Sequence, residues 1–145
     1  MINKFIGEQL AEWQTAADNF EALKGVKVKE LDVDGMKIKV QFNPARIISS
    51  SAKVDAKSLA ERKCFLCPAN LPEVQKGIVF KEHYNILVNP FPIFPRHLTV
   101  PEQAHVDQRI ATRMEDMLDL AKALTDYIIF YNGPKCGASA PDHAH

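Results

Sequence analysis

VKVKELDVDGMKIKVQF, residues 26–42, contains the pattern that decides the fold class. Apolar and charged residues alternate on both sides of Asp34-Gly35, and the alternation is most regular from Met36 to Phe42. Side chains of a β-strand point to opposite faces in turn, so alternation of this kind is typical of strands. Two such runs around an Asp-Gly pair predict an antiparallel β-hairpin.

Two segments with helical spacing lie on either side of this hairpin. In residues 2–24, apolar side chains recur at steps of three and four from Phe5 to Leu23, and Gly25 is a suitable stop. A second helix is predicted over residues 106–126. Its predicted buried stripe consists of Ile110, Met114, Met117, Leu118, Ala121 and Leu124.

The rest of the chain predicts short strands and loops. Strands are expected at residues 78–80, 84–88, 97–100 and 127–131, and a loop is expected from Ser49 to Lys63 with a short helix near residues 58–62. The three prolines between Asn89 and Pro95 require another loop. We therefore expect an α+β domain over residues 1–145, in which a meandering antiparallel sheet packs against two long helices.

Composition limits the classes of partner. The chain has 145 residues, 46% of them hydrophobic, and its 18 basic and 18 acidic residues give a formal net charge of zero. Proteins that coat nucleic acids or membranes carry a basic excess, so neither partner is expected, although a small anion remains compatible. No apolar run approaches the roughly 20 residues that span a bilayer, and the N-terminal residues do not resemble a signal peptide. We expect a cytoplasmic protein.

The pair Cys64-x-x-Cys67 points to a metal or redox site. Two thiolates from one tight turn can occupy adjacent corners of a zinc tetrahedron, and two neutral imidazoles would close it as a structural site. The candidates for the remaining ligands are His83, His97, His105, Cys136 and His143. His83 and His105 are expected to be surface bystanders. A thioredoxin-like pair is disfavoured by the prolines that follow Cys67, and a pair of buried cysteines without a ligand remains an alternative.

The last fourteen residues combine a glycine-containing loop with two histidines. Asn132 to Ser139 follows a predicted strand, and its small residues would let backbone N–H groups approach an anion. His143 and His145 would project from the same face of a strand, so that one could bind zinc while the other attacks phosphorus. An ordinary turn followed by a solvated tail is the alternative for this segment.

Taken in order, these motifs resemble the galactose-1-phosphate uridylyltransferase branch of the histidine-triad superfamily. The resemblance covers residues 43–145. The Gly-Ala-Ser and His-x-His motifs of this sequence are also similar to those of dinucleoside polyphosphate phosphorylases and GDP-hexose phosphorylases. The motifs that carry it are Asn43-Pro44-Ala45-Arg46, Cys64-x-x-Cys67, Pro95-x-His97-x-x-Val100-Pro101, Asn132-Gly133, Gly137-Ala138-Ser139 and His143-x-His145.

The resemblance implies a nucleotidyltransferase or phosphorylase that works through a covalent nucleotidyl-histidine. His145 matches the nucleophile of that family. The matching zinc ligands are Cys64, Cys67, His97 and His143, and the matching substrate or phosphate contacts are Asn89, Asn132, Gly137, Ala138 and Ser139. The implied partners are a nucleotide or nucleotide sugar and an acceptor, either a sugar phosphate or inorganic phosphate. A homodimer is implied by the same likeness.

Two departures from the family pattern affect what this chain can do. The family continues beyond His-x-His with a glutamine and usually with a second half, whereas this sequence ends at His145. We therefore expect the N-terminal part of a longer enzyme, incomplete at its C-terminus and nearly inactive by itself. A zinc-stabilised nucleotide-binding or assembly module without catalysis is the alternative function.

Overall fold

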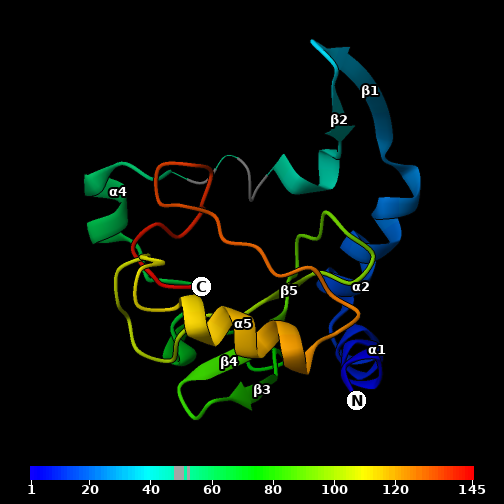
Figure 1. Ribbon diagram of the computed structural model, residues 1–145. Helices are drawn as coiled ribbons and strands as arrows, with labels where there is room; N and C mark the ends of the chain where they lie inside the picture. The colour runs from blue at the N-terminus through cyan, green and yellow to red at the C-terminus, as the bar shows by residue number, and fades with distance from the viewer. Residues whose placement is uncertain (48–50, 52) are drawn as a thin grey trace. The chain divides into compact units, whose positions relative to one another are not determined.

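The protein combines short helices with antiparallel sheets (Figure 1). The computed structural model describes residues 1–47, 51 and 53–145, so Ser49, Ser50 and Ala52 of the expected loop lie outside the described residues. The helices are α1 (Ile2–Glu12), α2 (Gln14–Ala22), α4 (Ala56–Glu61) and α5 (Met114–Ala123), with 3₁₀ turns at Leu23–Gly25, Pro44–Arg46 and Pro68–Asn70. The strands are β1 (Lys27–Val33), β2 (Met36–Phe42), β3 (Gly77–Phe80), β4 (Tyr84–Val88) and β5 (Leu98–Thr99).

The α+β class is confirmed, but its details differ from the expected single sheet with two long helices. The described residues form a two-stranded sheet, β1-β2, and a three-stranded sheet of order β3-β4-β5. β4 pairs with β5 in antiparallel fashion through Leu87↔Thr99 and Val88↔Leu98. Among the described residues, no helix has both the length and the apolar character needed to span a bilayer.

The chain divides into two compact units. The first contains Met1–Ala52, Pro72–Ile78 and Ile86–Thr99, and the second contains Lys53–Leu71, Val79–Asn85 and Val100–His145.

In the first unit, the helix predicted over residues 2–24 is interrupted at Trp13. Trp13 adopts an extended backbone (φ −114°, ψ 90°), which separates α1 from α2. Its side chain is buried together with Phe5 and Ile6 of the predicted apolar face, whereas the rest of that face is half-buried and the buried Ala16 was not part of it. No glycine or proline stands at the break, and the sequence therefore carried no local signal for it.

The side chain of Gln9 holds α1 to the segment before β3. It is only 2% exposed, its Nε2 donates to the Val74 carbonyl (3.2 Å), and its Oε1 accepts from the Lys76 N–H (2.8 Å). A buried amide needs these partners, because leaving it unsatisfied would cost about 1–3 kcal/mol.

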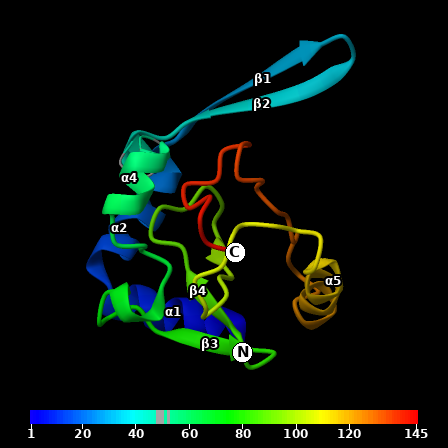
Figure 2. The ribbon, with the colours of Figure 1, turned by 90° about the vertical axis from the view of Figure 1, so that its left-hand side faces the viewer.

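The predicted hairpin is confirmed, and its two strands lie side by side along their whole length (Figure 2). The register runs from Lys27↔Phe42 to Val33↔Met36. Asp34 and Gly35 form the turn with φ values of 52° and 79°, and the Gly35 N–H donates to Asp32 Oδ1 (3.1 Å). The Asp-Gly pair accepts this left-handed backbone at low cost, which is why the local pattern was sufficient to predict the turn.

Side chains of the first unit fix the proline-containing loop that precedes β5. Four consecutive carbonyls each accept from a side chain: Pro90 from Asn19 (2.7 Å), Phe91 from Arg46 (3.0 Å), Pro92 from Asn43 (3.4 Å) and Ile93 from Gln41 (3.4 Å). Side-chain donors from distant parts of the sequence therefore order this loop. They supply the hydrogen bonds that these carbonyls do not receive from a neighbouring β-strand.

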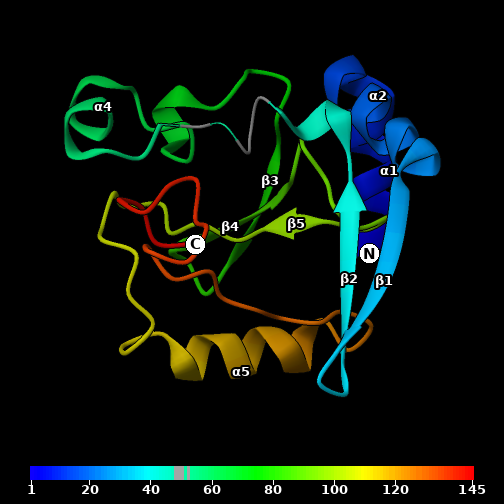
Figure 3. The ribbon, with the colours of Figure 1, turned by 90° about the horizontal axis from the view of Figure 1, so that it is seen from above.

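In the second unit, the expected helix over residues 106–126 is only α5, ten residues long (Figure 3). The preceding residues bond to the C-terminal segment instead: Glu102 N–H donates to the Ala144 carbonyl (2.9 Å) and Ala144 N–H donates to the Val106 carbonyl (2.7 Å). These tertiary hydrogen bonds replace those of a helix. Met114 and Leu118 of the predicted buried stripe are exposed, and residues 127–131 form no strand, so these predictions were wrong.

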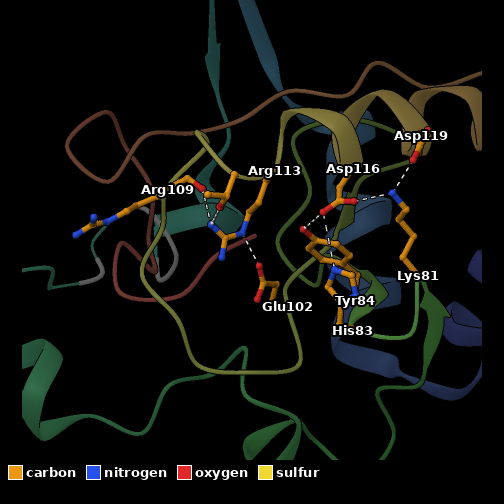
Figure 4. Close-up of polar contacts among 9 residues, drawn as sticks. Lys81, His83, Tyr84, Glu102, Arg109, Arg113, Asp116 and Asp119 are labelled. Atoms are coloured by element: carbon orange, nitrogen blue, oxygen red, sulfur yellow. Dashed lines mark hydrogen bonds and ion pairs between the residues drawn. The ribbon is translucent and has the colours of Figure 1, made fainter.

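The turn between β3 and β4 is attached to α5 by polar side chains (Figure 4). Lys81 Nζ contacts Asp116 (2.7 Å) and Asp119 (2.5 Å), and the Tyr84 hydroxyl donates to Asp116 Oδ2 (2.8 Å). The hydrogen bond from Lys81 lowers the pKa of Asp116, while burial raises the pKa of Tyr84. These contacts hold Lys81 and Glu82 in the left-handed region (φ 47° and 64°), which non-glycine residues rarely adopt.

Candidate metal centre

The two cysteines of the Cys-x-x-Cys motif lie on a compact turn in the second unit. The Cys67 N–H donates to the Cys64 carbonyl (3.4 Å), and the same carbonyl accepts from Asn70 Nδ2 (2.8 Å). Cys64 is buried and packs with Leu66 and Ala140. The turn therefore presents both sulfur atoms on one side, as a metal knuckle requires.

Four side chains bring donor atoms together at this turn: Cys64, Cys67, His105 and His143, whose ligand atoms all lie within 4.8 Å of one another. His143 Nδ1 lies 3.2 Å from Cys64 Sγ and 3.6 Å from Cys67 Sγ, and His105 Nδ1 lies 3.2 Å from Cys67 Sγ. Tetrahedral zinc with sulfur and nitrogen ligands would separate its donors by about 3.3–3.8 Å. The three separations are close to that range, so this group could hold a metal ion.

The orientation of His143 suits a ligand that binds through Nδ1. Its Nε2 lies 2.8 Å from the Glu102 carbonyl, which can only accept, so the proton resides on Nε2 and the lone pair on Nδ1 faces the sulfurs. His143 is completely buried, and burial lowers the pKa of its imidazole. The neutral ring that results is the form that coordinates metals.

His105 lies near a carboxylate, at a longer distance than the hydrogen bond of His143. Its Nε2 lies 3.7 Å from Asp142 Oδ2, and Asp142 in turn accepts from Arg62 Nη2 (2.9 Å). The rings of His105 and His143 meet edge to face with centroids 5.0 Å apart. A carboxylate behind a histidine orients the ring and strengthens it as a ligand.

Ionisation of the Cys67 thiol is unfavourable in this position. Burial, followed by the hydrogen bond with Cys64, raises the pKa of Cys67 above its usual value. A divalent metal would reverse this preference, because its charge stabilises both thiolates. The donor set of two sulfurs and two imidazole nitrogens matches closed structural zinc sites.

His105, not His97, completes this group, which corrects the expectation that His105 is a bystander. No local pattern pointed to His105, because its position depends on how residues 102–106 bond to residues 143–144. His97 lies in the first unit, where its Nδ1 accepts from the Ile93 N–H (3.2 Å). Burial, then the charge of Arg46, lowers the pKa of His97 to about 4.

Asn89 also lies in the first unit and serves the loop before β5. Its Oδ1 accepts from the Phe91 N–H (2.9 Å) and its Nδ2 donates to Thr99 Oγ1 (2.9 Å). The resemblance implied a substrate contact for Asn89, and in the structure both ends of its side-chain amide bond to residues that flank this loop.

His145 lies two residues after the candidate ligand His143 and is oriented by its carbonyl. His145 Nδ1 lies 2.8 Å from the His143 carbonyl, so this nitrogen carries the proton and Nε2 keeps its lone pair. Burial lowers the pKa of His145, which favours the neutral ring at pH 7. Among the described residues, Nε2 has no hydrogen-bonding partner, and it is the nitrogen available for chemistry.

Gln108, which the sequence did not single out, links His145 to the glycine-containing loop. Gln108 is 2% exposed, its Oε1 accepts from the His145 N–H (2.8 Å), and its Nε2 donates to the carbonyls of Asn132 (3.0 Å) and His145 (3.1 Å). A buried glutamine with three satisfied hydrogen bonds fixes the backbones that it joins.

The glycine-containing loop itself is a turn with one left-handed glycine. The Cys136 N–H donates to the Gly133 carbonyl (2.9 Å), and Gly137 has a φ of 95°, which requires glycine. Ala138 is buried, and the Ser139 carbonyl accepts from Arg62 Nη2 (3.1 Å). The expected contacts Asn132, Gly137, Ala138 and Ser139 thus lie in the same unit as His143 and His145.

The fold and site define an α+β protein with a candidate metal centre of two cysteines and two histidines. The family model for the domain of unknown function DUF4922 matches residues 5–145, and the chain belongs to that family. No curated protein and no solved structure matches the chain.

Proposed function

We propose that this chain carries the metal-stabilised nucleophile of a nucleotidyltransferase or nucleotide phosphorylase. The observation that supports this most directly is the state of His145: its Nδ1–H is held by the His143 carbonyl, and its Nε2 lone pair is left available. A neutral imidazole in a fixed tautomer is a competent nucleophile toward phosphorus near pH 7.

In this reaction, His145 Nε2 attacks the α-phosphorus of a nucleotide or nucleotide sugar. A P–N bond forms, the bond from phosphorus to the leaving phosphate oxygen breaks, and the leaving group departs with its electron pair. An acceptor phosphate oxygen, from inorganic phosphate or a sugar phosphate, then attacks the same phosphorus and releases neutral His145. Backbone N–H groups of Gly137 to Ser139 are the donors proposed to stabilise the charge on the phosphoryl oxygens.

Zinc is the metal proposed for Cys64, Cys67, His105 and His143. With four protein donors it would be a structural ion, supplying stability to the segment that holds His145 rather than taking part in bond formation. Its effect on His145 would pass through His143, whose ring would hold the ion while its carbonyl accepts from His145 Nδ1.

Covalent labelling tests the proposal without requiring turnover. The zinc-loaded chain is incubated with α-³²P-labelled UTP, ATP and GTP in turn, and we expect an acid-labile, base-stable label, typical of a phosphoramidate, on the peptide that ends at His145. His145→Asn should remove it, whereas His83→Asn, a change at an exposed histidine, should not. No label above background with any of the three nucleotides, or a label unaffected by His145→Asn, would contradict the proposal.

A non-catalytic, zinc-stabilised nucleotide-binding module is the second candidate, and it would use the same closed donor set. Four protein ligands leave no open position for substrate, as expected for a site that only stabilises. Nucleotide binding measured by calorimetry, together with the absence of any covalent label, would decide for this candidate.

A further inference from the structure

The hairpin β1–β2 has two chemically different faces. Residues directly opposite in an antiparallel pair share a face, so the register assigns each side chain to one of them. One face, which we call the ribbon face, contains Lys27, Lys29, Leu31, Val33, Met36, Ile38, Val40 and Phe42. The other face contains Val28, Glu30, Asp32, Lys37, Lys39 and Gln41, among them the pairs Glu30↔Lys39 and Asp32↔Lys37.

The ribbon face is apolar and uncovered. Its six apolar side chains are each between 36% and 62% exposed, and no other described helix or strand of the first unit packs closely against β1 or β2. A two-stranded hairpin is only marginally stable in water unless its apolar face is covered. A contiguous apolar surface of this kind on an ordered element marks a site of association.

We infer that the ribbon face is a self-association surface, on which the hairpins of two copies of this chain pack face to face and antiparallel. Charge supports a second copy in this orientation. Lys27 and Lys29 lie at the open end of the ribbon face, and Asp34 lies at the turn. An antiparallel pair places the lysines of each copy beside Asp34 of the other, whereas a parallel pair would place lysine beside lysine.

The available area is sufficient for a weak, specific dimer. Six apolar residues, each about half exposed, offer about 500 Å² per copy, and the stems of the two lysines add to it. Two copies would therefore bury on the order of 1,000 Å² or more, which is the lower end for a biological interface. We expect a dissociation constant in the micromolar range.

Charge argues against a lipid surface as the occupant of this face. The hairpin from Lys27 to Phe42 contains four lysines and three acidic residues, so it lacks the basic excess that anionic membranes select. Its polar face pairs the opposite charges across the strands, for instance Lys37 with Glu30 (3.9 Å). The inference does not depend on the proposed transferase chemistry, because it concerns a different part of the chain.

Sedimentation equilibrium of the whole chain, in its zinc-loaded form, tests the inference. Protein concentrations from about 1 to roughly 300 µM bracket the expected micromolar dissociation constant. Val40→Lys on the ribbon face is compared with Val28→Lys, which makes the same change on the opposite face at a similarly exposed position. We expect a monomer–dimer equilibrium that Val40→Lys weakens at least tenfold and Val28→Lys leaves within threefold. Lys27→Glu should weaken the dimer severalfold in low salt, because the substitution places a glutamate beside Asp34 of the other copy.

Each other outcome overturns the inference. A chain that stays monomeric at the highest concentration has no self-association surface, and a dimer insensitive to Val40→Lys forms elsewhere. A dimer strengthened by Lys27→Glu would be parallel, contrary to the orientation inferred here. If circular dichroism shows that Val40→Lys disturbs the fold, Ile38→Thr replaces it, because threonine retains the β-branched shape while reducing the apolar surface.

Discussion

Gln108 supplies hydrogen bonds that the residues around His145 cannot obtain otherwise. It is 2% exposed and satisfies the His145 N–H together with the carbonyls of Asn132 and His145. Replacing it with leucine leaves these buried groups without partners, so we expect Gln108→Leu to lower the free energy of unfolding by about 2–4 kcal/mol. Urea unfolding measures this, with Gln14→Leu as control, because Gln14 bonds only to Asp18 on an exposed helix surface and should change stability by less than about 0.5 kcal/mol.

A second substitution at this position, Gln108→Glu, separates a structural from a positioning role of Gln108. Gln108→Glu keeps an acceptor for the His145 N–H but loses the donor to both carbonyls. If positioning matters to the chemistry, covalent labelling of His145 should fall by tenfold or more in a Gln108→Glu protein that is still folded at the assay temperature. Unchanged labelling would limit Gln108 to stability.

His97 gives a prediction about pH. Its folded-state pKa of about 4 lies below the unfolded value of about 6.5, so the folded protein binds fewer protons between these values than the unfolded chain. The contribution of neutral His97 to the free energy of unfolding is therefore fully present above pH 6.5 and is lost as the pH falls toward 4. The total loss is at most about 3 kcal/mol. His97→Asn, which retains an acceptor for the Ile93 N–H, should flatten this dependence in unfolding measured from pH 4 to 7.5.

Release of a bound metal at low pH would also reduce stability. The comparison of wild type with His97→Asn must separate this effect from the protonation of His97. Because the candidate metal centre contains no contribution from His97, the difference between wild type and His97→Asn should persist when both proteins are measured with chelator. A difference that disappears without metal would instead assign His97 to the metal site.

At the scale of elements, the turn joining β3 to β4 is strained at two non-glycine residues. Glu82 has a φ of 64°, which costs a side-chain-bearing residue about 1 kcal/mol, and Glu82→Gly removes that cost. We expect the variant to be more stable by about 0.5 kcal/mol, since glycine also increases the entropy of the unfolded chain. Thermal unfolding should show a small rise in Tm, whereas Lys81→Met, which breaks the contacts to Asp116 and Asp119, should lower it.

The choice between His105 and His97 as a metal ligand can be measured directly. Elemental analysis of the purified protein should give about one zinc per chain. Since His105 Nδ1 lies beside Cys67 Sγ, His105→Ala should reduce or loosen the bound metal as Cys64→Ser does, and His97→Ala should not. The reverse result would restore the ligand set implied by the sequence resemblance.

Elements specified by neighbouring residues could be predicted, and those specified by distant residues could not. The hairpin and its turn follow from alternation and Asp34-Gly35, which are local signals. The helical pattern of residues 106–113 was also local, but hydrogen bonds from residues 143–145 prevail there. The same long-range pairing brings His105 to the cysteines, so the metal motif was visible in the sequence while its fourth ligand was not.

For the whole molecule, the candidate metal centre joins segments that are far apart in the sequence. The contact of Cys64 with His143 spans 79 residues and that of Cys67 with His105 spans 38. A metal that closes such loops removes conformational entropy from the unfolded chain, and binding energy becomes folding energy. All four ligands belong to the second unit, so the effect of metal should be greatest there.

Metal removal should therefore expose some segments of the chain much more than others. After chelation, we expect amide hydrogen exchange to accelerate by tenfold or more in residues 64–70, 102–108 and 138–145, because their backbones surround the ligands. Exchange in β1 and β2 should change less than threefold, since the hairpin has no ligand in it. Equal acceleration everywhere would mean that the metal stabilises a single cooperative structure, and no acceleration near Cys64 would mean that the four donors pack without an ion.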